Sequence, residues 1–568
     1  MAAEAWAGGI GIGAGAVLGV PALLAMAPPG RFRVLRSLGR GLALTSSVAL
    51  GGVGAGLALT RNAQAEYAAL PEDGLPLTYE PAAIAAFWSQ QNAIALRRLG
   101  VIGAKVAPFV ASLVYDNLTV GDAEKEAQQA VRARGLREIL TELGPTFIKF
   151  GQMLSIRPDV MPQAVITELQ KLCDAVPSYP TPRALELIER ELGAPAASLF
   201  LDLDASTEPI AAASLGQVYR CRLRSTGEVV ALKVQRPDML RAVSLDLYLL
   251  RKYMLAVEFF KVNILTGVFG AADRSSFDVA LLDTFANASY RELDYVNEGQ
   301  NQDRMKTAME GSAVYVPKVH WGVTRRKAIA TEWIEGIQLA KSPPDVIRKL
   351  VPAGVDCFLA QLLKHGFFHS DPHPGNLLVD TEGKLVLIDF GLCAEVDAMD
   401  SAAMTKALVD LMRGDVEGLL DDAVALRFLP ADVDREALLP ELRKIFQKGA
   451  LAADAVAKEQ ASLRAQGRGR SMATRRAQFG DVSKDLNSIF YAFPFAVPEY
   501  FALITRALIV LEGIALTGDR DFDIFRASYP YAAKHAATLF GIKELSQMLG
   551  AAAEAQGSQA LKDLIAGL

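Results

Sequence analysis

The chain has 568 residues, with 59 Lys and Arg against 64 Asp and Glu, so its formal charge is −5. A slightly acidic chain is not expected to bind nucleic acid, which requires a net basic surface, and 51% hydrophobic residues argue against disorder. The four cysteines form no CxxC pair, which argues against a disulfide framework or a zinc cage.

The first 65 residues have the composition of a targeting or membrane-anchoring segment. From Ala5 to Ala65 there is no Asp or Glu, and every charge is an arginine. Arg-rich, acid-free N-termini are typical of organelle import signals. The uncharged stretches Ala5–Gly30 and Gly41–Thr60 are each long enough to cross a bilayer. The pattern favours a removed targeting segment, with a retained membrane hairpin or a disordered leader as alternatives.

Changes in residue pattern divide the rest of the chain. A proline-containing linker is predicted at 66–91, and a helical extension at 92–200. Short alternating runs predict a small, strand-rich lobe at 201–335. Mostly helical patterns follow in a larger lobe at 336–480 and in a C-terminal extension at 481–568. The predicted fold class is therefore α+β, with a cleft between the two lobes.

A β-hairpin is predicted in the small lobe. The runs Val218–Leu223 and Val229–Val234 alternate and are joined by a turn that contains Gly227. The second run contains Ala231 and Lys233, and it resembles the V-A-I-K strand of protein kinases, whose lysine contacts the nucleotide phosphates. Its apolar neighbours favour a lysine in the cleft over one on an exposed strand.

The strongest chemical pattern lies at 369–391. Asp371 and Asn376 are five residues apart in a tight loop, and the apolar strand that follows ends in Asp389-Phe390-Gly391. Phosphoryl transfer needs one carboxylate near the acceptor, and an amide with a second carboxylate to hold Mg²⁺. The order resembles the kinase pattern H-R-D-x-x-x-x-N…D-F-G, with Ser370 in place of arginine. Asp371 is therefore predicted as the catalytic carboxylate, and Asn376 and Asp389 as Mg²⁺ ligands.

Further residues are predicted to complete a nucleotide site. Glu298 is predicted to pair with Lys233. Glu332 and Ile334 follow a strand-like run and are expected in the hinge that holds the adenine. His369 is expected to support the backbone of the loop that follows it.

The expected glycine-rich loop departs from the kinase pattern. When residues 211–218 are aligned with G-x-G-x-x-G-x-V, two of the three glycine positions hold alanine. A Cβ restricts positive φ and keeps the backbone from closing onto the phosphates, so an altered grip on the γ-phosphate is expected. No A-P-E triplet follows Asp389, so a platform for peptide substrates is not visible. The nucleotide contacts predicted around this loop are Ala211, Ala212, Ala213, Ser214, Val218 and Ala231.

Three motifs together carry a family resemblance. Lys149-Phe150-Gly151-Gln152 matches the KxGQ signature of the UbiB family of atypical kinases, also called AarF-domain-containing kinases. Glu292-Leu293-Asp294 (ExD) and the alanine-rich loop match this family as well. The resemblance implies a two-lobe, protein-kinase-like fold with an N-terminal helical extension and a C-terminal helical region. It also implies a charged latch, in which Lys149 and Gln152 lie against Glu292 and Asp294 and block the peptide site.

The resemblance further implies a function. It implies a Mg²⁺-dependent, ATP- or ADP-binding atypical kinase or ATPase that supports prenylquinone or isoprenoid-lipid metabolism at an organelle membrane. The expected partners are such a lipid, the membrane surface and quinone-biosynthesis proteins. The chloroplast (plastoglobule or thylakoid) is favoured, and the inner mitochondrial membrane is the alternative. Two other functions stay open, a Ser/Thr kinase acting on membrane-associated proteins and a low-turnover nucleotide-sensing scaffold.

Two C-terminal features have ordinary structural explanations. Five arginines between 464 and 476 could meet anionic lipid, but a solvated loop is favoured. The stretch 494–516 is strongly apolar, although Glu499, Arg506 and Glu512 interrupt it. A buried amphipathic helix is therefore favoured over a membrane span.

Overall fold

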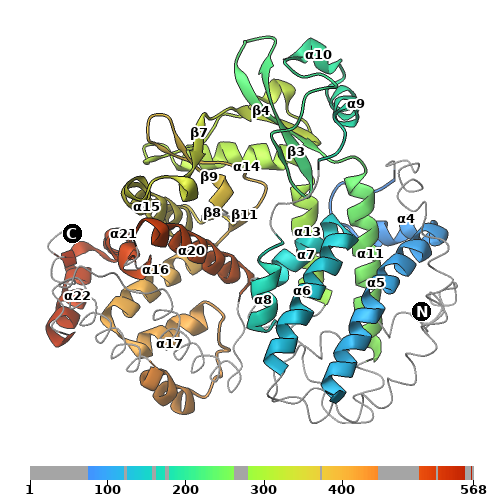
Figure 1. Cartoon of the computed structure of the whole chain (residues 1–568). Coiled ribbons are helices and arrows are strands. Elements are labelled where there is room, and N and C mark those ends of the chain that lie inside the picture. The colour runs from blue at the N-terminus through green and yellow to red at the C-terminus, as the bar shows by residue number, and fades with distance from the viewer. Residues whose placement is uncertain are drawn as a thin grey trace. The chain divides into compact units, whose positions relative to one another are not determined.

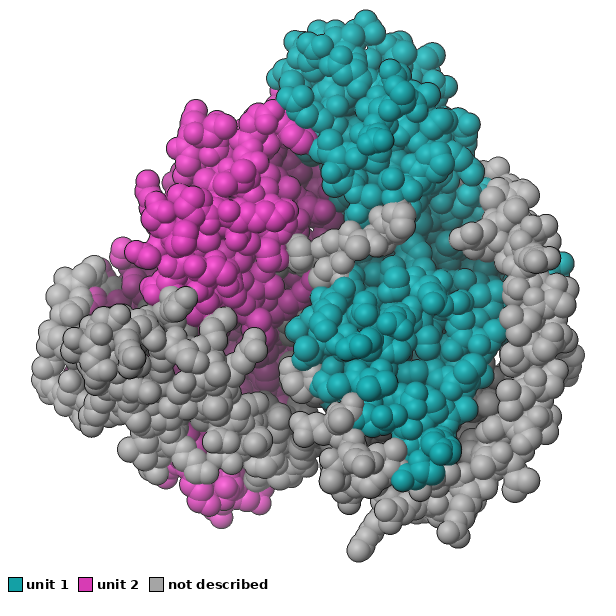
Figure 2. Space-filling view, in the orientation of Figure 1, with its two compact units in different colours: residues 1–297, 320–331 teal, residues 298–319, 332–568 magenta. Residues whose placement is uncertain are grey.

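The chain divides into two compact units, which Figure 2 colours separately. Unit 1 comprises residues 1–297 and 320–331, and unit 2 comprises residues 298–319 and 332–568. The predicted leader at 1–65 and the arginines at 464–476 lie outside the described residues, and the predicted cleft between lobes stays a prediction. The computed structural model describes residues 74–119, 125–155, 161–172, 178–260, 279–370, 374–445, 498–519, 522, 524–556 and 564–565.

Unit 1 combines a helical part with a small sheet (Figure 1). Its helices are α4 (Pro81–Ser89), α5 (Asn92–Thr119), α6 (Lys125–Leu143), α7 (Pro145–Leu154), α8 (Gln163–Leu169), α9 (Thr181–Leu192), α10 (Ala196–Leu199), α11 (Met239–Phe260), α13 (Val279–Glu292) and the 3₁₀ turn η5 (Trp321–Val323). Its strands are β1 (Phe200–Leu201), β2 (Ala211–Ala212), β3 (Gly216–Leu223), β4 (Val229–Gln235) and β6 (Ala328–Glu332), whose last residue belongs to unit 2.

The predicted hairpin is confirmed as β3 and β4. The sheet has the order β1-β3-β4-β6, and β2 pairs with the first half of β3, at Gln217 and Val218. On β4, Val230, Leu232 and Val234 are buried, as the alternation requires. They form one core with Leu187 and Ile188 of α9, so this helix covers one face of the sheet. Side chains at the alternate positions of β4 face the other way.

The helical part of unit 1 has its own core, and it begins earlier than predicted. The predicted linker at 66–91 is wrong for its second half, because residues 81–89 form α4. Trp88 of α4 is fully buried, and its indole Nε1 donates a hydrogen bond of 3.1 Å to Ser244 Oγ on α11. The proline that suggested a linker instead begins α4, because proline is well tolerated in the first turn of a helix.

Unit 2 is built from helices and short strands. Its helices are α14 (Tyr295–Ala308, of which the first three residues belong to unit 1), α15 (Pro344–Leu359), α16 (Ala398–Arg413), α17 (Val416–Ala425), α20 (Glu499–Gly518), α21 (Ile524–Phe540) and α22 (Ile542–Gln556), with the π-helix η7 (Ala360–Lys364) and the 3₁₀ turns η6 (Leu339–Lys341) and η8 (Pro374–Asn376). Its strands are β5 (Val314–Tyr315), β7 (Gly336–Gln338), β8 (Phe367–His369), β9 (Leu377–Asp380), β10 (Leu385–Leu387) and β11 (Cys393–Glu395).

The short strands of unit 2 correct the prediction of a mostly helical lobe. They form a sheet of order β5-β10-β9-β7 and a separate pair, β8 with β11. A strand leading to Asp389 was predicted from the sequence, and β5 lies within the predicted strand-rich lobe at 201–335. Strands of two to four residues are too short to show an alternating pattern, so the others could not be recognised.

The apolar stretch 494–516 contributes a helix with a buried face, as predicted. Ile504, Leu511 and Ile514 of α20 join the main core of unit 2, and α20 packs against α15. Among the described helices, the one long and apolar enough to cross a bilayer is α5, over Asn92–Asp116, with a mean hydropathy of 1.4 and 22% of that stretch buried. Length and composition alone select it.

We expect Gly216→Ala to destabilise the sheet. A Cβ at Gly216 would lie 2.6 Å from the main-chain oxygen of Val234 and 2.5 Å from the hydroxyl of Tyr295. The backbone oxygen cannot rotate away, so β3 and β4 must separate locally. Overpacking of this kind costs about 1–3 kcal/mol, which a lower Tm will report. Gly322→Ala is the matched control, because a Cβ there meets nothing within 4 Å. Equal Tm values for the two variants would contradict this explanation.

A second expected effect concerns pH. Lys406 Nζ lies 2.7 Å from both Asp410 and Asp422, and burial raises the pKa of Asp422 to about 6. A carboxyl group whose pKa is raised by folding stabilises the fold at low pH and loses that contribution as the pH rises through the folded value. Between pH 4.5 and 7, the Tm should therefore fall more in the wild type than in Asp422→Asn. The control is Asp421→Asn, on the exposed side, and a wild-type slope retained in Asp422→Asn would contradict the assignment.

Candidate functional site

The predicted cleft lysine lies on β4 of unit 1. In the hairpin register Lys233 is directly opposite Val218, so both side chains share the face of the sheet that points away from Leu232. Ala231 lies on this same face, two residues earlier. Lys233 Nζ lies 5.2 Å from the ring centre of Tyr295. The hairpin thus brings three of the predicted nucleotide contacts together on one surface.

The alanine-rich loop is a tight hairpin rather than an open loop. Ala211 and Ala212 pair with β3, and the amide of Ala213 donates to Gly216 O at 2.8 Å. Arg236 fixes the loop a second time, because its Nε donates to Ala213 O at 3.1 Å. None of the three alanines has a positive φ. Ser214 lies in the turn. Main-chain hydrogen bonds and the Arg236 side chain therefore hold this hairpin together.

The charged latch is present in part. Lys149 Nζ of α7 lies 2.7 Å from Glu292 Oε2 at the end of α13, and the glutamate side chain is only 8% exposed. Gln152 does not face a carboxylate, because its Nε2 donates to Leu172 O at 2.8 Å. Asp294 accepts from the amide of Val296 at 3.0 Å and so serves the start of α14. The predicted contact of Gln152 with the acids is therefore wrong, since the amide is used to satisfy a backbone carbonyl.

Gln235 ties the ExD loop to the lysine strand. Its side-chain Nε2 donates to Leu293 O at 3.0 Å, and its main-chain oxygen accepts from Tyr179 OH at 2.8 Å. Gln235 is buried and follows Lys233 by two residues. Sequence analysis missed Gln235, because a glutamine at the end of a strand gives no signal unless its partners elsewhere in the same chain are known.

In unit 2, two predicted magnesium ligands lie at the same end of a hairpin. The antiparallel strands β9 and β10 pair Leu377 with Leu387. Asn376 directly precedes this pair and Ile388 directly follows it, and the amide of Ile388 donates to Asn376 O at 3.0 Å. Asp389 is the next residue. The pairing therefore brings the backbones of Asn376 and Asp389 to the same end of the β9–β10 hairpin, although they are 13 residues apart in the sequence.

Asp389 has a strained backbone conformation that His369 supports. Its φ is 62°, in the left-handed region that residues with a Cβ rarely adopt. The Nε2 atom of His369 is hydrogen-bonded to Asp389 O, and since a carbonyl can only accept, Nε2 carries the proton. The ring also packs edge-on against Phe390, with 5.5 Å between ring centres. His369 thus supports the backbone, as predicted, at Asp389.

Glu298 of α14 joins this acidic region. It is buried, with 5% exposure. A Cβ built on Gly391 would lie 3.3 Å from Asp389 Oδ1 and 3.6 Å from Glu298 Oε2, so both carboxylates border the same glycine. Burial, together with the charges of Asp389 and Glu298, raises the pKa of the Cys393 thiol above its usual range. Two acidic side chains, Asp389 and Glu298, thus lie together in this part of unit 2.

The donor set fits a hard divalent cation. Asn376 offers an amide oxygen and Asp389 a carboxylate, while Glu298 stays predicted as the partner of Lys233. Within the part of the chain that the structure describes, no group of three His, Cys, Asp or Glu could hold a metal by itself. This composition suits Mg²⁺, which is usually held by one or two carboxylates and completes its shell with water and substrate phosphates.

Several predicted site residues are placed only in part. Asp371 lies outside the described residues. Lys233 and Glu298 belong to different units, so their pairing stays a prediction. The chain passes from unit 1 to unit 2 before Glu332, where the hinge was expected, and Ile334 follows in the segment between β6 and β7.

The Glu332 carboxylate is already engaged within unit 2. It accepts hydrogen bonds from Tyr315 OH at 2.6 Å and from the amide of Lys318 at 3.1 Å. Burial and this hydrogen bond raise the pKa of Tyr315 to about 12. The main-chain amide of Glu332 is engaged as well, because it donates to Lys318 O at 2.8 Å.

Comparisons with known proteins agree with these motifs. The ABC1 atypical kinase-like domain matches residues 171–423. The chain is 40% identical over 494 residues to Protein ACTIVITY OF BC1 COMPLEX KINASE 3, chloroplastic, of Arabidopsis thaliana, which covers 84% of this chain and 63% of that protein. It is 36% identical over 440 residues to the uncharacterized protein slr1919 of Synechocystis sp., with 76% of this chain and 71% of that protein covered.

Two further comparisons set the limits of the match. The uncharacterized aarF domain-containing protein kinase At1g71810, chloroplastic, of Arabidopsis thaliana is 35% identical over 451 residues, covering 79% of this chain and 59% of that protein. The chain thus spans less than two thirds of the length of these two Arabidopsis relatives. The solved Rv3197–erythromycin complex from Mycobacterium tuberculosis aligns at 24% identity over 59% of this chain and 82% of that one, with a TM-score of 0.37. On the matched domain and these relatives, the chain belongs to the ABC1 atypical kinase-like family, also called the UbiB or AarF family.

Proposed function

We propose that the protein binds ATP and transfers or hydrolyses its γ-phosphate in a Mg²⁺-dependent reaction. The observation that carries this proposal is the strained backbone of Asp389, held by the His369 ring at the sheet edge that Asn376 shares. Backbone strain of this kind costs of order 1–3 kcal/mol and persists where the surroundings over-determine it, typically at functional sites. A role in metal binding gives this strain a reason.

Each proposed role follows from the chemistry of the side chain. Lys233 is proposed to contact the nucleotide phosphates, and Glu298 to orient it. Asn376 and Asp389 would hold Mg²⁺, which supplies positive charge to phosphate oxygens when bound. Asp371 is proposed as the carboxylate next to the acceptor hydroxyl or water. Val218, Ala231 and Ile334, with the main chain of Glu332, are proposed to contact the nucleotide.

Hydrolysis or transfer to a small acceptor is favoured over phosphorylation of peptides. The ion pair between Lys149 and Glu292 ties the KxGQ helix to the ExD loop, and breaking a partly buried ion pair is costly. The hairpin at Ala211–Ala213 is fixed by Arg236, so it is proposed to cover the phosphates less closely than a glycine loop does. Efficient phosphorylation of a protein substrate would require both features to move.

The biological setting is a wider proposal. Several relatives are named chloroplastic, which supports a chloroplast location over the inner mitochondrial membrane. We propose a role in prenylquinone or isoprenoid-lipid metabolism at a membrane surface, with the lipid and quinone-biosynthesis proteins as partners. The apolar, mostly unburied helix α5 is consistent with contact to a membrane.

We expect Asp389→Asn to lower Mg²⁺-dependent ATP turnover about 100-fold or more, because one carboxylate ligand is lost while the charge of the phosphates stays. Asparagine tolerates positive φ, so the backbone should be kept and the Tm should change little. ATP turnover measured against Mg²⁺ concentration tests this. Asp432→Asn, on the exposed surface, is the control. Wild-type turnover in Asp389→Asn would refute the proposed enzyme.

We expect Ala213→Gly to change how the loop meets the nucleotide. Glycine opens positive φ at this position and weakens the fixed hairpin, so the preference between ATP and ADP should shift or phosphotransfer to protein should rise. Nucleotide affinity and transfer to a generic protein substrate are the measurements. Ala205→Gly, in an exposed turn outside the loop, is the matched control. If Ala213→Gly matches the wild type in both assays, the alanines do not restrict the loop.

A further inference from the structure

Gln361 lies at an irregular turn directly before the strand that ends in His369. Residues Ala360–Lys364 form a π-helix, in which the amide of His365 bonds Ala360 O at 3.0 Å, five residues back. Such insertions into an α-helix are rare and re-aim the side chains that follow them. Gln361 is 2% exposed, so both ends of its amide must find partners inside the protein.

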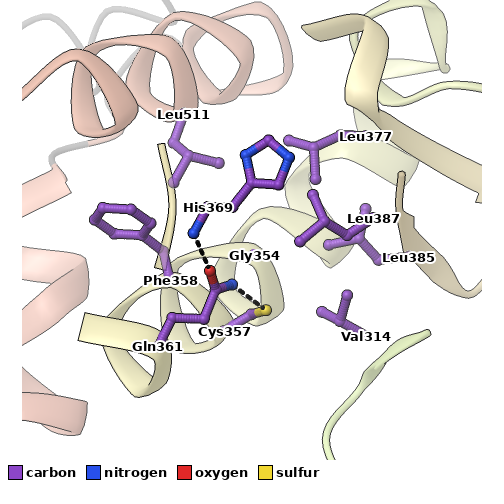
Figure 3. A pocket seen from close by; sticks show the side chains of 10 residues that line it. All are labelled: Val314, Gly354, Cys357, Phe358, Gln361, His369, Leu377, Leu385, Leu387 and Leu511. Carbon is purple, nitrogen blue, oxygen red and sulfur yellow. Dashed lines mark hydrogen bonds between the residues drawn. The ribbon is translucent and has the colours of Figure 1, made fainter. Parts of the chain in front are cut away.

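Both ends of that amide are satisfied (Figure 3). Oε1 accepts a hydrogen bond of 2.9 Å from the main-chain amide of His369, and Nε2 donates to Cys357 Sγ at 3.2 Å. The Cys357 sulfur in turn lies 3.5 Å from Met309 Sδ. The contacts border a pocket whose other lining residues are mostly apolar, including Leu377, Leu385, Leu387 and Leu511. Gln361 is therefore a polar link in an otherwise apolar region.

The partner of Gln361 is the residue that supports Asp389. The main chain of His369 is held by Gln361, and the ring of His369 is bonded to Asp389 O. The next residue, Ser370, donates its amide to Leu392 O at 3.0 Å, which links the same segment to β11. A displacement of His369 along β8 would thus move its ring away from the strained carbonyl.

We infer that Gln361 is a positioning residue for the proposed Mg²⁺ ligand Asp389, acting through the backbone of His369. This inference rests on the proposed function, because it assigns Gln361 to the same site. A packing role alone predicts that any side chain of similar volume suffices. A positioning role requires a hydrogen-bond acceptor at Oε1, aimed at the amide of His369.

The test compares variants that differ in this acceptor. Gln361→Met keeps the length and volume of the side chain but has no such acceptor, and Gln361→Ala is the second apolar variant if methionine does not fit. Gln361→Glu keeps an oxygen that accepts from His369 N. Leu511→Ala truncates an apolar side chain in the same pocket and makes no polar contact with His369. It is the control for loss of packing.

We expect the apolar variants to raise the Mg²⁺ concentration for half-maximal ATP turnover about fivefold, the effect of one net hydrogen bond, with little change in KM for ATP. Gln361→Glu should restore the wild-type Mg²⁺ dependence. Leu511→Ala should lower the Tm without changing the Mg²⁺ dependence. Unchanged Mg²⁺ dependence in folded Gln361→Met or Gln361→Ala would overturn the inference, as would an equal shift in Leu511→Ala.

A second readout separates this inference from the proposed function. Amide hydrogen exchange at residues 388–393 should be faster in Gln361→Met than in the wild type, and unchanged in Leu511→Ala, because only the former loses the support of His369. If the wild type shows no ATP turnover while exchange responds as expected, the proposed function fails and the positioning role stands. If turnover is present and neither exchange nor Mg²⁺ dependence responds, the positioning role fails.

Discussion

The hydrogen bond between the His369 ring and the carbonyl of Asp389 is the contact on which the site in unit 2 depends. It holds a carboxylate-bearing residue in a backbone conformation that residues with a Cβ rarely adopt. Strand pairing restrains the neighbouring segments, since β8, which ends in His369, pairs with β11, and β9 pairs with β10 before Asp389. Gln361, placed by the π-helix, fixes the residue that makes this contact. A site in unit 2 is thus built from short segments that are individually weak and mutually restrained.

Unit 1 uses a different set of restraints. The ion pair of Lys149 with Glu292 joins α7 to α13, and Gln235 joins β4 to the ExD loop. The KxGQ helix, the ExD loop and the end of the lysine strand are therefore connected by side-chain contacts within one unit. Such a network is expected to respond as a whole, because loss of Lys149 would remove a positive charge 2.7 Å from a largely buried carboxylate. This connection supports the proposal that the KxGQ and ExD motifs together disfavour the phosphorylation of peptides.

The accuracy of the sequence-based predictions depended on the length of each signal. The hairpin around Lys233 was correct because two alternating runs around a glycine turn constrain the backbone locally. The linker prediction failed at Trp88, because the apolar face of a helix as short as α4 is recognised only when its partner α11 is known. Gln152 was assigned to the acids by resemblance, yet its amide is used by Leu172 O, a partner that no motif specifies. Gln361 was missed for the same reason.

The sequence by itself determined the α+β class, the lysine strand, the kinase-like order of Asn376 and Asp389, and the KxGQ and ExD motifs that carry the family resemblance. These are properties of local pattern and of spacing, which the chain carries before it folds. Only the tertiary structure decided that Asp389 is strained, that His369 and Gln361 support it, and that Lys149 pairs with Glu292 while Gln152 bonds Leu172 O. Each of these depends on a hydrogen bond or charge pair between residues distant in sequence or on a single backbone angle, and burial decides which partner satisfies which polar group.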